Sequence, residues 1–287
     1  MCVLDFLGDY VDEQLSWLQA IALGISQGLT EFLPISSTAH TLIVSKLLGW
    51  PDPGAAFTAV TQVGTELAVV IYFRQDIARI LKAWFSSFTK KSERANPDAK
   101  MGWYVIIGTI PIGIAGLAFK SSIETTARNL WLVAATLIIM GILLGLADRF
   151  ARHTKSEPDI NTKNAVLFGL GQALALIPGV SRSGATITAG LVMGFKRDVA
   201  ARYSFLLAIP AVFASAALTA GDISSDSFVN WPATIVATIV AFVVGYLVIA
   251  SLMKYLQTRT FLPFVIYRIA LGSLLMVLLA NGVLSAT

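Results

Sequence analysis

The sequence is poor in charge and almost free of cysteine. Only 13% of its 287 residues are Asp, Glu, Lys or Arg, whereas an ordinary soluble domain carries about 25%. Too few charges remain to cover a water-exposed surface, which excludes a disordered chain, a soluble globular fold and a nucleic-acid-binding surface. The single Cys2 excludes an internal disulfide and suggests no cysteine metal site.

Long apolar stretches fill the space between clusters of charge. A stretch of 17 or more residues crosses a hydrocarbon core of about 30 Å as a helix, and lipid leaves no other way to satisfy the backbone. Two stretches, 15–49 and 164–195, are apolar but interrupted midway by Pro, Ser and Gly. We predict an all-α polytopic membrane protein with about ten helical segments, forming one domain over residues 1–287. Six full spans are predicted at 55–73, 102–119, 130–147, 203–220, 232–253 and 262–285.

Basic residues set the predicted topology. Segments 74–100 and 148–163 hold most of the Lys and Arg, so we expect both to be cytoplasmic loops. The acidic N-terminus and segment 221–230, which has no Lys or Arg, belong outside. These assignments agree only if 15–49 and 164–195 each return to the side from which they enter. Each is therefore predicted to be a re-entrant helix hairpin with its break inside the membrane.

The two halves of the chain resemble each other. The segment beginning at Gly24 aligns with the one beginning at Gly169, 145 residues later, and both contain a Gln three residues on. A broken hairpin followed by three spans makes an odd number of crossings, so the second unit must start on the opposite face. We predict an inverted-topology repeat. Its units cover about 15–147 and 164–285.

The first interrupted stretch carries a carboxylate, hydroxyls and an imidazole. Gln27 and Glu31 are spaced i,i+4 and share a helix face. Pro34 is expected to end that helix. Ser37 and His40 are spaced i,i+3, the minimum for a hydroxyl activated by a general base. Three hydroxyl residues occupy the predicted start of the next half-helix as capping residues: Ser36, Ser37 and Thr38.

The second interrupted stretch is typical of an anion site. A Pro-Gly break at Pro178 is followed by Arg182 at the predicted start of a half-helix. Free backbone N–H groups and the helix dipole favour an anion there, and the Arg fork matches phosphate oxygens. The pattern predicts a phosphate-bearing ligand. Residues expected to contact it from this stretch are Gly179, Ser181, Ser183 and Thr186.

Structural interpretations of these residues stay open. Glu31 and Arg182 are also compatible with an ion pair between the repeats, and His40 with a hydrogen-bonded core histidine. Membrane hydroxyls often only satisfy backbone carbonyls. Glu66 either faces the cavity or has a structural partner, and Arg268 anchors or lines the site from the last helix.

At these residues the sequence resembles a known family. QGLTEFLPISSTAH and PGVSRSGAT are similar to the (Glu/Gln)-x-x-x-Glu, Ser-Ser-Thr-x-His and Pro-Gly-x-Ser-Arg-Ser-x-x-Thr motifs of bacterial undecaprenyl-diphosphate phosphatases of the bacitracin-resistance type. The match includes LPFVIYR at 262–268. The first position of the motif is Glu or Gln in the family, and here it is Gln27. This weakens the prediction of a metal site shared by two carboxylates. Ala39 replaces an expected Gly.

The resemblance implies a hydrolase of the bacterial plasma membrane. It would convert undecaprenyl diphosphate into undecaprenyl phosphate and inorganic phosphate, recycling the lipid carrier of cell-wall synthesis and giving bacitracin resistance on overproduction. A divalent cation, Mg²⁺ or Ca²⁺, is implied, with Glu31 and Gln27 as its expected ligands. Expected partners are the polyprenyl diphosphate lipid, the bilayer and a second copy of the chain in a homodimer.

The mechanistic hypothesis places these residues around a diphosphate in a cavity open to the outer side. Ser37 attacks the terminal phosphorus or orients water, His40 takes the proton, and Glu31 holds the metal or orients His40. Arg182 binds phosphate oxygens. Ser36 and His40 are alternative nucleophiles. The expected substrate-binding residues are Gln27, Ser36, Thr38, Gly179, Ser181, Ser183 and Thr186.

A transporter or flippase for a phosphorylated lipid or small anion is the alternative function. Inverted repeats with broken helices are common in transporters, and Arg182 suits an anionic substrate. Transport does not need Ser37 and His40 beside Glu31, so these residues favour the enzyme.

Overall fold

The computed structural model describes residues 15–51, 53–119, 129–223 and 230–286, and within them the chain is all-helical. The predicted outer positions of the N-terminus and of most of segment 221–230 lie outside the described residues. The α-helices are α1 (Trp17–Thr30), α2 (Ser37–Leu48), α3 (Gly54–Tyr72), α4 (Arg74–Thr89), α5 (Pro97–Ala118), α7 (Leu130–Phe150), α8 (Thr162–Ala173), α9 (Arg182–Val192), α10 (Arg197–Ile223), α11 (Trp231–Leu256) and α12 (Leu262–Ala280). Short 3₁₀ helices are η1 (Lys91–Ala95), η2 (Glu157–Asp159) and η3 (Leu174–Leu176).

Among the described residues, five helices are long and apolar enough to cross a membrane: α5, α7, α10, α11 and α12. They coincide with five of the six predicted spans. The sixth, predicted at 55–73, coincides with α3, which meets the same test only together with α4, across a bend of 79°. The protein is therefore a multi-pass membrane protein with five or six candidate spans.

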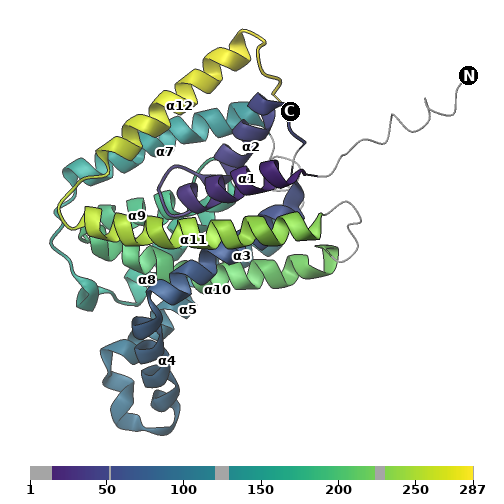
Figure 1. Ribbon diagram of the computed structural model, residues 1–287. Helices are drawn as coiled ribbons and strands as arrows, with labels where there is room; N and C mark the ends of the chain where they lie inside the picture. Colours follow the sequence, from purple (N-terminus) through teal and green to yellow (C-terminus); the bar gives the residue numbers. More distant parts are fainter. Residues whose placement is uncertain (1–14, 52, 120–128, 224–229, 287) are drawn as a thin grey trace, which may run out of the picture.

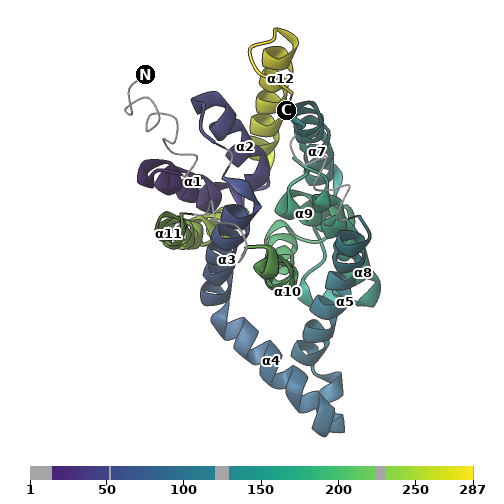
Figure 2. The same ribbon diagram turned by 90° about the vertical axis from the view of Figure 1, so that its right-hand side faces the viewer.

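The expectation of a loop at 74–100 was wrong, because most of this segment is helical. In α4 the residues Ile80, Ala83 and Ser87 recur at three- and four-residue intervals and are buried, while Arg74 and Lys82 are exposed. The charges of α4 therefore lie on the outer face of an amphipathic helix. Both ribbon views show α4 projecting from the rest of the helices together with the start of α5, against which it packs (Figures 1 and 2).

Both interrupted stretches are broken as predicted. Residues 31–36 separate α1 from α2, and residues 177–181 separate η3, at the end of α8, from α9. The end of the first helix agrees with the prediction for Pro34. α1 ends at Thr30, four residues before Pro34, and in a continued helix the proline ring would clash with the carbonyl of that residue.

Helices from the two halves of the chain pack against each other. The α1 helix lies along α11, α8 lies along α5, and α7 lies along α12 (Figures 1 and 2). Glycines permit the first two approaches, because a Cβ on Gly24 would lie 2.5 Å from the Ala237 carbonyl oxygen and one on Gly169 would lie 2.2 Å from that of Gly108. This packing brings the two breaks together.

Candidate active site

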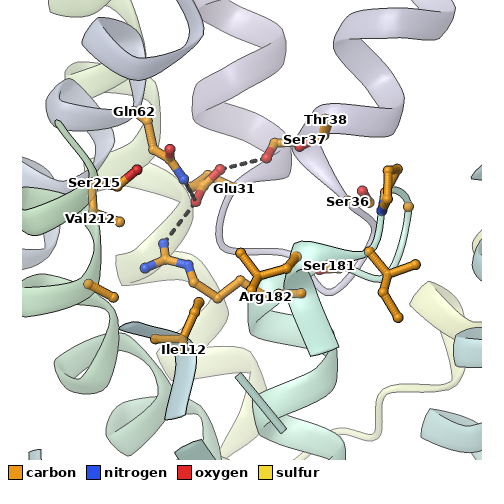
Figure 3. A pocket seen from close by; sticks show the side chains of 16 residues that line it. Glu31, Ser36, Ser37, Thr38, Gln62, Ile112, Ser181, Arg182, Val212 and Ser215 are labelled. Atoms are coloured by element: carbon orange, nitrogen blue, oxygen red, sulfur yellow. Dashed lines mark hydrogen bonds and ion pairs between the residues drawn. The ribbon is translucent and has the colours of Figure 1, made fainter. Parts of the chain in front are cut away.

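A pocket with a volume of about 200 Å³ lies where the two breaks meet. The first break contributes Glu31 and Ser37, and the second contributes Arg182 (Figure 3). Helices α3, α5 and α10 complete the wall. The prediction that both broken stretches share one site is confirmed in the described residues. Further lining residues include Ser36, Thr38, Gln62, Ile112, Gly179, Ser181, Val212 and Ser215.

The carboxylate of Glu31 is the centre of the hydrogen-bond network. Its Oε2 accepts from Gln27 Nε2 at 2.9 Å and from Ser37 Oγ at 2.6 Å. Its Oε1 accepts from Gln62 Nε2 at 3.1 Å and from Arg182 Nη2 at 2.8 Å. A carboxylate has about four acceptor positions, so Glu31 is fully satisfied. The predicted common face of Gln27 and Glu31 is confirmed.

Arg182 is the first residue of α9 and presents its guanidinium to two carboxylates. Nη2 lies 2.8 Å from Glu31 Oε1 and 3.4 Å from Oε2 of Glu66, whose side chain is fully buried on α3. Ser181 caps α9 by accepting from the Gly184 N–H at 3.1 Å. A guanidinium at a helix N-terminus supplies positive charge and hydrogen-bond donors that suit a phosphate group.

The expected pairing of Ser37 with His40 was wrong. The Ser37 hydroxyl donates to Glu31, and His40 uses both ring nitrogens elsewhere. Its Nδ1 lies 2.7 Å from the Ser36 carbonyl oxygen, which only accepts, so Nδ1 carries the hydrogen; Nε2 lies 2.7 Å from the hydroxyl of Tyr267. His40 therefore supports the backbone of the first break, as the structural interpretation allowed.

The expected substrate-binding residues divide into two groups. Four of them line the pocket: Ser36, Thr38, Gly179 and Ser181. The other three are not among the lining residues, and their side chains bond to other groups of the protein. Gln27 is bonded to Glu31, Ser183 Oγ lies 3.3 Å from the carbonyl oxygen of Glu31, and Thr186 Oγ1 lies 2.6 Å from that of Arg182 and also contacts Ser204.

Arg268 joins the two breaks from behind the pocket. Its fully buried guanidinium donates to the carbonyl of Pro34 at 2.9 Å and to those of Gly179 and Val180 at 3.0 Å each. Weaker bonds reach two carbonyls of α7. Of the two roles expected for Arg268, the structure supports anchoring, since this residue is not among those that line the pocket.

A divalent cation on Glu31 and Gln27 fits this arrangement poorly. All four acceptor positions of Glu31 are occupied, and the Gln27 amide group already donates to it. In the described part of the chain, no three His, Cys, Asp or Glu residues are grouped so that they could hold a metal ion. We therefore derive no catalytic step through a metal.

Sequence reasoning missed Gln62 and Tyr267. Gln62 lies one helical turn before Glu66, so the i,i+4 spacing of two polar residues within an apolar helix was an available signal. Tyr267 directly precedes Arg268, which drew attention instead. Its contact with His40 joins residues 227 positions apart, and no local pattern indicates it.

Comparison with known proteins gives a consistent result. Residues 20–274 match the family described as "Bacitracin resistance protein BacA". The chain is 57% identical to an undecaprenyl-diphosphatase of Thermobifida fusca, covering 94% of this chain and 93% of that relative. It is 54% identical to an undecaprenyl-diphosphatase of a Nocardioides species, covering 95% and 100%. A third relative, undecaprenyl-diphosphatase 2 of Streptomyces coelicolor, is 53% identical, covering 94% and 97%.

Proposed function

The chain belongs to the bacitracin resistance protein BacA family and is a membrane hydrolase of undecaprenyl diphosphate, and we propose that the pocket between its two broken helices is where hydrolysis occurs. One observation carries the proposal: the Ser37 hydroxyl and the Arg182 guanidinium both bind Glu31 within the same recess. A nucleophile and a phosphate-binding cation are thus each one hydrogen bond from the same proton acceptor.

Hydrolysis begins with competition for Arg182. The terminal phosphate and Glu31 are both anions, so the bound diphosphate draws the guanidinium away from Glu31. Glu31 then accepts the proton of Ser37 while Oγ attacks the terminal phosphorus. The bridging P–O bond breaks, and undecaprenyl phosphate leaves with the electron pair. Water then attacks the phosphorus and the P–Oγ bond breaks; Glu31 returns its proton to Oγ, and inorganic phosphate leaves.

Phosphate release from undecaprenyl diphosphate by purified protein tests this assignment. Ser37→Ala should lower turnover at least 10³-fold, and Thr41→Val, a buried change on the same helix, should leave it near the wild-type value. Acid quenching followed by mass spectrometry should find phosphate on Ser37. Near-normal turnover of Ser37→Ala would exclude this serine as the nucleophile.

The implied cation is tested by calorimetry. Arg182 and the N–H groups at the start of α9 supply positive charge to the diphosphate. If Glu31 and Gln27 hold a cation, calorimetry of the substrate-free protein should detect Mg²⁺ binding that Glu31→Gln abolishes. The saturated hydrogen bonds of the Glu31 carboxylate support the opposite result, no binding without substrate.

We further propose that the two breaks belong to re-entrant hairpins in an inverted repeat. Two features support this. Gly24 and Gly169, 145 residues apart, both lie at the closest approach to a helix of the other half. Ser36 and Ser181, also 145 residues apart, share the same unusual backbone conformation. The proposed units are 15–147 and 164–285.

The pocket is proposed to open to the outer side of the plasma membrane, as the distribution of basic residues indicates. A Cys2→Ser background makes this testable, because the chain has one cysteine. Thr38→Cys should then react with a membrane-impermeant maleimide added to intact cells, and diphosphate should protect it. The homodimer stays a prediction, which light scattering of the purified protein tests.

A further inference from the structure

A second carboxylate lies behind the pocket, and the proposed hydrolysis does not use it. Glu66 lies on α3, and its side chain is fully buried. Its Oε2 is 3.4 Å from Arg182 Nη2, while its Oε1 is buried without a hydrogen-bond partner in the described structure. Placing an ionisable group at membrane depth is costly and usually serves a function. Glu66 therefore needs an explanation beyond packing.

Glu66 contacts Arg182 from outside the pocket. Glu31 lines the cavity, whereas Glu66 is not among the lining residues. The guanidinium nitrogen Nη2 thus has one carboxylate on the substrate side and one on the protein side. One turn before Glu66 on α3, Gln62 donates to Glu31, so one helix face supports both members of the ion pair.

This arrangement matters when the substrate arrives. A diphosphate competes with Glu31 for Arg182, and without a second anion the guanidinium would be free to follow the phosphate out of its catalytic position. Position 27 holds an amide, so it cannot supply that anion. This inference rests on the proposed function. We propose that Glu66 is a positioning residue: it holds the Arg182 guanidinium in place while Glu31 gives up its bond to Arg182 and accepts the proton of Ser37.

Glu66→Gln tests the proposal because it keeps the volume and removes the charge. We expect kcat to fall about 10- to 100-fold, as for a misplaced catalytic group, with KM changed less than about twofold, since the phosphate still reaches Arg182. The probe is undecaprenyl diphosphate in detergent. The control is Thr61→Val, which changes another buried residue of α3. A kcat within about twofold of wild type would overturn the proposal.

A double-mutant cycle separates positioning from general damage. In an Arg182→Lys background, which retains the charge but loses the planar fork, Glu66→Gln should lower kcat by less than about a further twofold. Independent, multiplying losses would overturn the proposal. If Glu66→Gln does not fold, Glu66→Leu replaces it in the test. If neither variant folds while Thr61→Val does, the role of Glu66 is in the stability of the fold, and the proposal is overturned. Loss of phosphate release in wild type itself would instead overturn the proposed function, and this inference with it.

Discussion

Ser36 and Ser181 adopt the same backbone conformation at the two breaks, with φ of 74° and 72°. Each is the N-cap of the helix that follows, and each side-chain oxygen accepts from the backbone N–H three residues on, at Ala39 and Gly184. Positive φ is unfavourable for a residue with a Cβ. The capping hydrogen bond and the fixed turn compensate for this strain at both positions.

Replacing Ser36 should separate strain from capping. Ser36→Ala loses the cap and keeps the strained φ, whereas Ser36→Gly loses the cap and removes the strain. We expect the free energy of unfolding of the glycine variant to exceed that of the alanine variant by about 1 kcal/mol. Thermal unfolding in detergent should therefore rank wild type first, Gly second and Ala last. An alanine variant as stable as the glycine variant would show that this backbone conformation is not strained.

His40 should prove to be a structural support and not the catalytic base. His40→Gln retains an amide that can donate to the Ser36 carbonyl, so we expect turnover within about 10-fold of wild type and an unchanged pH profile of kcat/KM. Loss of a true general base costs about 10²- to 10⁴-fold. A loss of that size, with normal thermal stability, would restore the original assignment. Tyr267→Phe removes the hydroxyl at Nε2 and serves as the matched, milder variant.

The sequence allowed prediction of what local patterns specify. Apolar length and residue type located five spans and both breaks, because lipid restricts each segment to a helix. The motif residues Glu31, Ser37 and Arg182 were placed in one site. Partners chosen by packing were not predictable: Ser37 and His40 have the right spacing for a pair, but the turn at 31–36 directs the Ser37 hydroxyl toward Glu31.

The helix at α4 was missed for a different reason. Charge was counted along the chain and not around a helix axis, and Ile77, Ile80 and Trp84 at helical spacing were overlooked among ten charged residues in 74–100. Amphipathic periodicity is the better signal for such a segment.

Arg268 should be needed for the shape of the pocket. Its guanidinium donates only to carbonyl oxygens, and Lys has three donors without a planar fork, so it cannot satisfy all of them. Arg268→Lys should lower kcat at least about 10-fold and reduce the unfolding temperature, since each buried carbonyl left unpaired costs about 1–3 kcal/mol. Activity and unfolding temperature equal to wild type would show that water replaces the lost donors.

An apolar groove provides the last prediction. It has a volume of about 740 Å³, lies between α5, α7, α8 and α9, and shares Leu176, Ile177 and Pro178 with the active-site pocket. This continuity makes it the expected path of the polyprenyl chain. The polyprenyl chain is in an apolar environment both in the bilayer and in the groove. The groove therefore aligns the substrate and contributes little hydrophobic energy to binding.

Filling the groove should therefore discriminate between substrates by chain length. Ala115→Trp, in the groove wall on α5, should raise KM for undecaprenyl diphosphate about fivefold, equivalent to ~1 kcal/mol, and leave KM for the shorter farnesyl diphosphate unchanged. Ala118→Trp is the matched control, because Ala118 is exposed on the same helix and outside the groove wall. Only a chain long enough to leave the polar pocket can meet the new indole ring. Equal effects of both variants on KM, or equal effects on both substrates, would therefore mean that the polyprenyl chain follows another path.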